Sequence, residues 1–215
     1  MSASRSASLA LAALALFTGC RPPRVVPLAG APAPAYSLPR GIVPPAHEKV
    51  VFNWELRDGE MSARGQGVAR LASPDSVRLD FFLGGGFGGG AAVMIGDSLI
   101  VPPGADVSRK LIPPRPLLWA ALGRLQLPAE RDTVVRVDEG LLRADIGAPV
   151  QWRVTFRGDT LTRLEHIEGG RLQEWVQRGQ DGAVQYHNES SRRSLSLSIQ
   201  RADAVPAFDP SIWSF

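Results

Sequence analysis

Side chains alternate between apolar and polar along much of this 215-residue chain, and this period of two residues restricts its fold more than any other feature. In one early run, Phe52, Trp54 and Leu56 alternate with Asn53 and Glu55. The pattern recurs over residues 61–71, 77–81, 91–95, 98–101, 152–157, 172–178, 183–188 and 194–201. Each such run predicts a strand with one buried face.

Short turn signals separate these runs. Gly96-Asp97, Gly158-Asp159, Gly169-Gly170 and Asp181-Gly182 are dipeptides of the kind that closes a β-hairpin. Strands joined by such short connections run in opposite directions, so we expect an antiparallel sheet.

Residues 116–125 depart from the period of two. They place an apolar stripe on one face of a helix, formed by Leu117, Leu118, Ala121, Leu122 and Leu125. Pro116 suits the first turn of this helix. Because the helix falls between two groups of strands, we expect it to cover an open sheet. The predicted fold class is mainly β (α+β), a curved antiparallel half-barrel sheet covered by a helix.

The run 61–71 has an unusual face. Its inward positions are all small or apolar, namely Met61, Ala63, Gly65, Gly67, Ala69 and Leu71. Glycines in a strand permit strong curvature or the close approach of something bound against the concave side.

A glycine-rich loop follows the strand over residues 77–81, with three glycines on each side of Phe87. Residues 84–89 match the letters of a dinucleotide fingerprint, but the helix that such a site requires does not follow. Two interpretations stay open. Phe87 folds back onto the core, or it forms an apolar finger that enters a bilayer or a partner's groove.

The chain start resembles a bacterial lipoprotein signal. Arg5 precedes a short apolar run over residues 9–17, and Thr18 and Gly19 lie directly before Cys20, the only cysteine. The resemblance implies cleavage before Cys20, a diacylglyceryl thioether on its sulfur, and attachment to the membrane through those acyl chains. Arg21 follows, rather than the aspartate that marks inner-membrane retention, which favours the inner leaflet of the outer membrane, facing the periplasm.

Three segments are expected. Residues 1–19 form the signal peptide, residues 20–47 the lipidated cysteine and a tether rich in proline and alanine, and residues 48–215 a single β domain. The formal net charge of +3 is too small to indicate nucleic acid as a partner.

No motif indicates an enzyme, a cofactor or a metal site. His166 could be paired with Glu165, and His187 with Ser190, but neither pair has a third group to orient it. Glu165, Glu168 and Glu174 could be combined into a metal site, although scattered acids on strands are usually solvated. We therefore expect a non-catalytic protein without a cofactor.

The order of these features resembles the LolA/LolB superfamily of periplasmic lipoprotein carriers and outer-membrane receptors. The similarity lies in the anchored start, the meander of strands, the run 77–90, the helix and the closing residues 208–215. It implies an incomplete barrel whose helical lid encloses a cavity for acyl chains. It also places Phe87 where the receptor projects an apolar residue.

Two functions follow as hypotheses. In the first, the concave sheet binds acyl chains or lipoprotein cargo, and the expected wall residues are Phe52, Trp54, Leu79, Phe81, Leu118, Leu122, Trp152 and Val154. In the second, the same fold has a filled core and holds another envelope protein without transferring lipid. Sequence alone does not separate them, since a filled core shows the same alternation.

Overall fold

The computed structural model describes residues 22–39, 46–85, 88–103, 109, 111–127 and 132–215. The strands are β1 (Ala31–Ala33), β2 (His47–Asp58), β3 (Met61–Ala72), β4 (Ser76–Leu83), β5 (Gly89–Ile95), β6 (Ser98–Ile100), β7 (Thr133–Asp138), β8 (Leu141–Ile146), β9 (Trp152–Arg157), β10 (Thr160–Glu168), β11 (Arg171–Arg178), β12 (Ala183–Asn188) and β13 (Arg193–Ala204). The helices are the α-helix α2 (Arg115–Ala121) and the short 3-10 helices η2 (Ala35–Ser37) and η3 (Pro210–Trp213).

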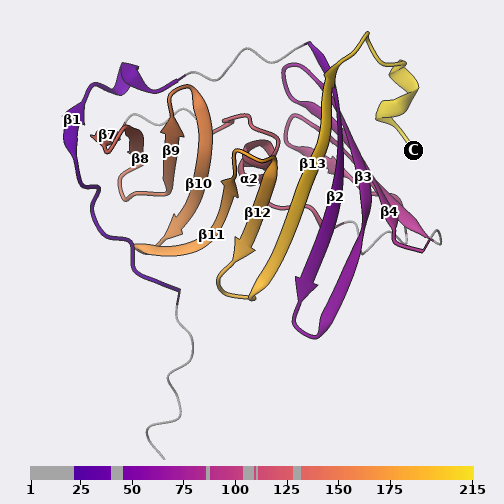
Figure 1. Ribbon diagram of the computed structural model, residues 1–215, viewed down its shortest axis with the longest axis horizontal. Coiled ribbons are helices and arrows are strands. Elements are labelled where there is room, and N and C mark those ends of the chain that lie inside the picture. The colour runs from indigo at the N-terminus through magenta and orange to yellow at the C-terminus, as the bar shows by residue number, and fades with distance from the viewer. Residues whose placement is uncertain (1–21, 40–45, 86–87, 104–108, 110, 128–131) are drawn as a thin grey trace, which may run out of the picture.

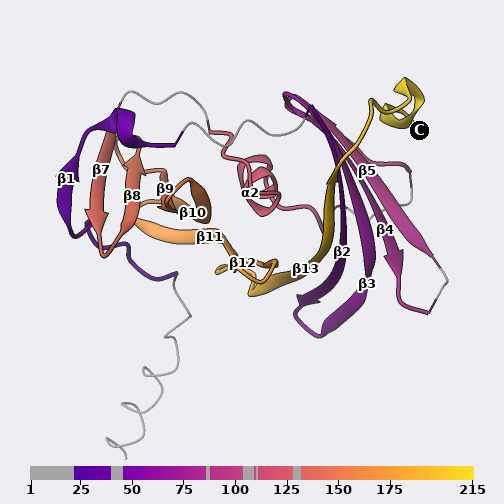
Figure 2. The same cartoon turned by 45° about the horizontal axis from the view of Figure 1, so that its top comes forward.

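All described strands join one antiparallel sheet in the order β1-β7-β8-β9-β10-β11-β12-β13-β2-β3-β4-β5-β6 (Figure 1). The pairing of β13 with β2 joins the run of hairpins from β7 to β13 to the earlier run from β2 to β6, so that both form one sheet. The sheet curves around α2, which lies on its concave side (Figure 2). The predicted fold class, a curved antiparallel sheet covered by a helix, is confirmed.

The predicted inward faces are the buried faces. Val50, Phe52, Trp54 and Leu56 on β2 are at most 4% exposed. The core continues through the alternate residues of β4, β9, β10 and β11, and it closes beneath α2.

The helix begins as expected, with Pro116 in its first turn, but it is shorter than the predicted 116–125. It ends at Ala121 because Gly123 adopts a φ of +84°, outside the helical region. The prediction of a single apolar face is also wrong, since Trp119 and Ala120 are as buried as Leu117 and Leu118. A helix buried on all sides has no solvated face to show a period in the sequence.

The segment predicted to be a tether packs on the sheet where the structure describes it. β1 pairs with β7, Val25 N–H donates to the Gly170 carbonyl (3.0 Å), and Leu172 N–H donates to the Pro23 carbonyl (2.9 Å). Proline is tolerated on an edge strand, so a segment rich in proline can still add to a sheet at its margin. The folded part therefore begins well before residue 48.

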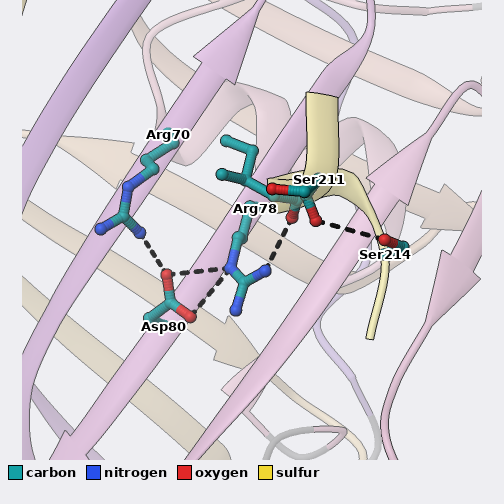
Figure 3. A network of polar contacts seen from close by, with 6 residues as sticks. Arg70, Arg78, Asp80, Ser211 and Ser214 are labelled. Atoms are coloured by element: carbon teal, nitrogen blue, oxygen red, sulfur yellow. Dashed lines mark hydrogen bonds and ion pairs between the residues drawn. The ribbon is translucent and has the colours of Figure 1, made fainter. Parts of the chain in front are cut away.

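The C-terminal segment crosses the outer face of β3 and β4. There the Asp80 carboxylate pairs with both Arg70 and Arg78, and Arg78 also donates to the Ile212 carbonyl (2.7 Å, Figure 3). The Arg78 guanidinium lies 5.1 Å from the centre of the Phe215 ring. One arginine thus links the sheet to the end of the chain.

Candidate binding site beneath helix α2

Helix α2 packs against β10, β11 and β12 and encloses the middle of the concave face. Polar contacts hold it at both ends. At the start, Arg115 pairs with Asp97; at the end, the Arg178 guanidinium donates to the Ala121 carbonyl. Just beyond the helix, Arg124 pairs with Glu48 on β2 (3.1 Å). The helix is therefore fastened to both sides of the curved sheet.

Two of these arginines are held in an apolar environment. Burial lowers the pKa of Arg124, and the hydrogen bond and charge of Glu48 oppose that effect. Burial likewise lowers the pKa of Arg178, and Glu48 again opposes it. Because a buried cation without a partner is costly, Glu48 is the group that makes the closed position of the helix tolerable.

A small apolar cavity lies between the helix and the sheet. Its volume is about 30 Å³, and it is lined by Phe52, Leu79, Phe81, Leu111, Pro113, Leu118, Ala121, Leu122, Val184, Tyr186, Leu195 and Leu197. This volume has room for about one or two waters, whereas ligand pockets usually enclose about 300 to 1,000 Å³. With the helix in this position, the space does not hold an acyl chain.

Five of the eight expected wall residues meet at this cavity: Phe52, Leu79, Phe81, Leu118 and Leu122. Trp54, Trp152 and Val154 do not line it. Val154 is fully buried in the core, and the Trp152 ring stacks on His166 with 4.7 Å between ring centres.

The glycine face of β3 is filled by aromatic rings. A Cβ atom at Gly67 would clash with the Phe52 ring. One at Gly65 would clash first with the Phe82 carbonyl of β4 and would lie 2.9 Å from the Trp54 ring. Phe81 packs edge-on against both rings, with 6.2 Å between centres in each case. The expectation that these glycines admit a bound molecule is therefore corrected, since side chains of the neighbouring strand occupy the space.

A polar cluster that the sequence did not reveal lies on the concave face beside the cavity. The buried Glu174 carboxylate accepts from the Tyr186 hydroxyl (2.9 Å) and from the Asn188 amide (2.6 Å). Arg193 donates to the Tyr186 hydroxyl (3.2 Å). Burial is the main cause that raises the pKa of Tyr186. Only the pairing of β11, β12 and β13 brings these residues together, so spacing in the sequence gave no signal.

The histidines lie apart from the partners considered in the sequence. His166 Nδ1 is 3.9 Å from Glu174 rather than beside Glu165, and His187 Nε2 is 3.7 Å from Glu189. The Ser190 hydroxyl donates to Gln173 instead (3.0 Å). Neither arrangement provides a nucleophile held by a base.

The three candidate metal ligands also lie in three different environments. Glu165 pairs with Arg163 (2.7 Å), Glu174 belongs to the tyrosine cluster, and Glu168 is exposed. In the described part of the chain, no group of three or more potential ligands is close enough to hold a metal ion.

Two predicted site residues, Cys20 and Phe87, lie outside the described residues. Close to the glycine-rich loop, Phe82 near the end of β4 has a side chain that is half exposed on the outer face of the sheet. Across the described ranges, no helix combines the length and apolar character needed to cross a bilayer.

No protein-family model and no curated protein matches this sequence. Among solved structures, a LolA superfamily protein from Nitrosomonas europaea aligns at 12% identity with a TM-score of 0.48, covering 80% of this chain and 91% of that one. A DUF1329 family protein from Desulfovibrio piger aligns at 10% identity with a TM-score of 0.45, covering 79% of this chain and 90% of that one.

A domain described as an outer membrane lipoprotein-sorting protein, from Vibrio parahaemolyticus, aligns at 7% identity with a TM-score of 0.44, covering 78% of this chain and 89% of that one. These are partial likenesses of fold. The candidate binding site rests on the geometry described above.

Proposed function

We propose that this protein is a non-catalytic lipoprotein of the cell envelope that binds an acyl chain between α2 and the concave sheet. In this proposal Cys20 carries the lipid anchor and holds the domain on the periplasmic side of the outer membrane. The acyl chain belongs to a lipid or to a lipoprotein cargo. In the described conformation α2 closes over the cavity.

One observation carries the proposal: the cavity beneath α2 is lined almost wholly by apolar side chains, while the helix over it is fastened by polar contacts. Those contacts, Arg124 with Glu48 and Arg178 with Ala121, can be replaced by water when the helix moves. The apolar lining cannot be solvated without cost and therefore favours an apolar occupant. Displacing α2 joins the 30 Å³ cavity to the space that the helix now fills.

The test uses the full chain with Cys20→Ser, so that any acyl chain detected comes from the cavity rather than from the anchor. Mass spectrometry of the solvent extract and fluorescence of an apolar probe report occupancy. Glu48→Gln keeps the side-chain shape but weakens the hold on Arg124. Because a hydrogen bond to a charged group contributes about 1.5 to 3 kcal/mol, we expect probe uptake to become roughly tenfold faster.

Glu55→Gln is the matched control. It removes the same charge from the same strand, but Glu55 pairs with the exposed Arg57 on the opposite face of β2 from the buried residues. Probe uptake should stay at the parent rate. If neither the parent nor Glu48→Gln carries lipid or brightens the probe, the cavity does not bind acyl chains.

Phe87 is proposed as an apolar finger that contacts the bilayer or the cargo. In that role Phe87→Glu leaves the melting temperature of the Cys20→Ser chain nearly unchanged and weakens its delivery of a fluorescent acyl lipid to vesicles. In the other role, Phe87 packs in the core, and the change buries an unpaired carboxylate, which destabilises by several kcal/mol. A large fall in melting temperature with unchanged delivery would end the finger proposal.

A second function is favoured by the small size of the cavity. In it the core is permanently filled, and the domain holds another envelope protein through an exposed surface. Hydrogen exchange separates the two. A movable lid exchanges its α2 amides far faster than β2 does, whereas a filled core protects both elements to the same degree.

A further inference from the structure

A hollow of about 480 Å³ lies on the outer face of β8, β9, β10 and β11, on the opposite side of the sheet from the cavity. Its floor is Thr155, a small side chain in the middle of β9. Leu28, in the N-terminal segment, forms an apolar side wall. The volume falls within the range of ordinary ligand pockets, about 300 to 1,000 Å³. We refer to it as the Thr155 hollow.

Arginines surround Thr155 on four sides. Arg153 and Arg157 flank it along β9, each about 7 Å away on the same face of the strand. Arg143 on β8 and Arg163 on β10 are its direct cross-strand partners, each about 5 Å away. All four line the hollow, as does Arg178, whose guanidinium donates to the Ala121 carbonyl.

A β-bulge creates this arrangement. The register of β10 against β9 shifts between Leu161 and Arg163, so that Thr162 is the extra residue and its hydroxyl donates to the Thr155 carbonyl (3.1 Å). The shift keeps Leu164 in the core and turns Arg163 outward, opposite Thr155. Bulges commonly redirect a side chain next to a binding site.

The four cations are not fully neutralised. Arg153 is held by both oxygens of Asp145 (2.6 and 2.9 Å), and Arg163 is held by Glu165 (2.7 Å). Arg143 meets Asp138 only at 3.5 Å. Within the described ranges, Arg157 has no carboxylate partner and is exposed. Arg157 and Arg143, on adjacent sides of Thr155, are thus the two guanidinium groups of the four that are least neutralised.

We propose that the Thr155 hollow binds a phosphate group, carried by a phosphate ester whose organic part contacts Leu28. A guanidinium donates two parallel hydrogen bonds to phosphate oxygens, and several such groups around one site suit an anion with more than two oxygens. Arg157 and Arg143 are the direct ligands. Arg153 and Arg163 are positioning residues, fixed by their ion pairs. The phosphate comes from a soluble ester or from a lipid headgroup.

The experiment measures binding of inorganic phosphate and glycerol 3-phosphate to the Cys20→Ser full chain by calorimetry at low salt. Arg157→Gln and Arg143→Gln each remove one direct ligand from an accessible position, so neither is expected to unfold the chain. Arg201→Gln is the matched control, because Arg201 is an exposed arginine on β13 in the other half of the sheet. Thermal melts check that all variants are folded.

We expect glycerol 3-phosphate to bind, each direct-ligand variant to weaken binding at least about tenfold, and Arg201→Gln to leave it unchanged. Sedimentation with vesicles of phosphatidylglycerol mixed with phosphatidylcholine, against phosphatidylcholine alone, identifies the source. If binding to the anionic vesicles depends on Arg157, the phosphate group belongs to a lipid headgroup. If it does not, the phosphate group belongs to a soluble ester.

The proposal is overturned if neither phosphate compound binds and no vesicle binding depends on Arg157. It is equally overturned if Arg201→Gln weakens binding as much as Arg157→Gln, because the effect is then general attraction to a basic protein. These outcomes can be told apart from those of the acyl-chain cavity, which is tested with an apolar probe. Arg178, which lines the hollow and also donates to the Ala121 carbonyl, is unchanged in every variant of this experiment.

Discussion

The two halves of the sheet differ in how their interior is filled and in what lies on their outer face. In the half made of β2, β3 and β4, the interior is filled by the rings of Phe52 and Trp54 lying over Gly67 and Gly65. In the half made of β7 to β11, each inward position carries its own side chain, such as Ala144, Val154 and Leu164, all fully buried. In the first half, rings thus reach across a strand that carries glycine, whereas in the second half each strand supplies its own inward side chains, Phe156 among them.

The outer faces of the two halves share one arrangement of side chains. In each half an arginine paired with an aspartate also donates to a terminal segment. Arg78, paired with Asp80, reaches the Ile212 carbonyl (2.7 Å), and Arg153, paired with Asp145, reaches the Val26 carbonyl (2.8 Å).

In the first half, the arginines Arg70 and Arg78 share one carboxylate beneath the C-terminal segment. In the second half, Arg157 lies next to an open hollow. A similar device thus fastens both ends of the chain, and the two halves differ in that, among the described residues, a hollow lies beside it only in the second half.

The largest expected effect tests how the first half is packed. Gly67→Ala places a Cβ atom 2.4 Å from the Phe52 ring, inside a core that is already full. We expect the free energy of unfolding to fall by about 3 kcal/mol, because overpacking forces side chains from their rotamers. Thermal and urea unfolding of the Cys20→Ser chain measure this loss.

The double variant Phe52→Leu/Gly67→Ala sharpens the test. Its loss should be smaller than the sum of the two single losses by at least about 1 kcal/mol, since the methyl group then occupies space that the ring has vacated. In the second half, Ala144→Gly should cost only about 1 kcal/mol. Additive losses at Phe52 and Gly67 would show that the ring does not fill the glycine face.

An intermediate effect is expected from the aspartates that fasten the chain ends. Asp145→Ala and Asp80→Ala each leave arginines partly buried without a carboxylate, and we expect a loss of about 2 kcal/mol, between the values for exposed and buried pairs. The two variants should differ in where protease cuts first. Asp145→Ala exposes the segment near Val26, and Asp80→Ala exposes the segment near Ile212.

Glu55→Ala serves as the control for both, because the pair of Glu55 with Arg57 is exposed and should contribute less than about 1 kcal/mol. Limited proteolysis followed by mass spectrometry locates the first cut. The same cleavage pattern in both aspartate variants would contradict the view that each half fastens its own end of the chain.

The smallest expected effect concerns pH at the junction of the two halves, where Tyr186 lies on β12. Burial raises the pKa of Tyr186, so the folded chain keeps the phenol proton at pH values where the unfolded chain has begun to lose it. The resulting stabilisation is complete below about pH 10 and is lost as the pH rises through the raised pKa. Stability should therefore decline above about pH 10.

Tyr186→Phe removes this contribution and makes the decline shallower, although it also leaves Glu174 with one hydrogen bond fewer. Urea unfolding at a series of alkaline pH values measures the slope. An equally steep decline in Tyr186→Phe would assign the effect to groups other than Tyr186. The buried Arg124 and Arg178 are not among them, because burial lowers their pKa values and such a shift makes stability rise with pH.

Much of the fold could be predicted because alternation reports burial directly. Trp152, Val154 and Phe156 are inward, as their spacing indicates, and so are Val77, Leu79 and Phe81. β7 and β8 were not predicted because their residues do not separate into one apolar and one polar face. Val134 and Val137 are both exposed although they lie on opposite faces of β7, so the apolar pattern did not mark an inside.

The candidate sites were predictable only in part. Arg153, Thr155 and Arg157 share a face that alternation reveals, but the other two arginines of the hollow lie on neighbouring strands. Their positions depend on the register of β8 and on the bulge at Thr162. The contact of Arg124 with Glu48, just beyond the end of α2, likewise joins residues distant in sequence.

The sequence by itself determined the class of fold, the inward face of most strands and the position of the helix. All of these are local patterns, since a strand or a turn is specified by residues a few positions apart. The tertiary structure alone decided that aromatic rings fill the glycine face, that the cavity beneath α2 is nearly closed, and that four arginines surround Thr155. Those features depend on register and on how closely separate strands approach, and neither quantity is set by any single run of residues.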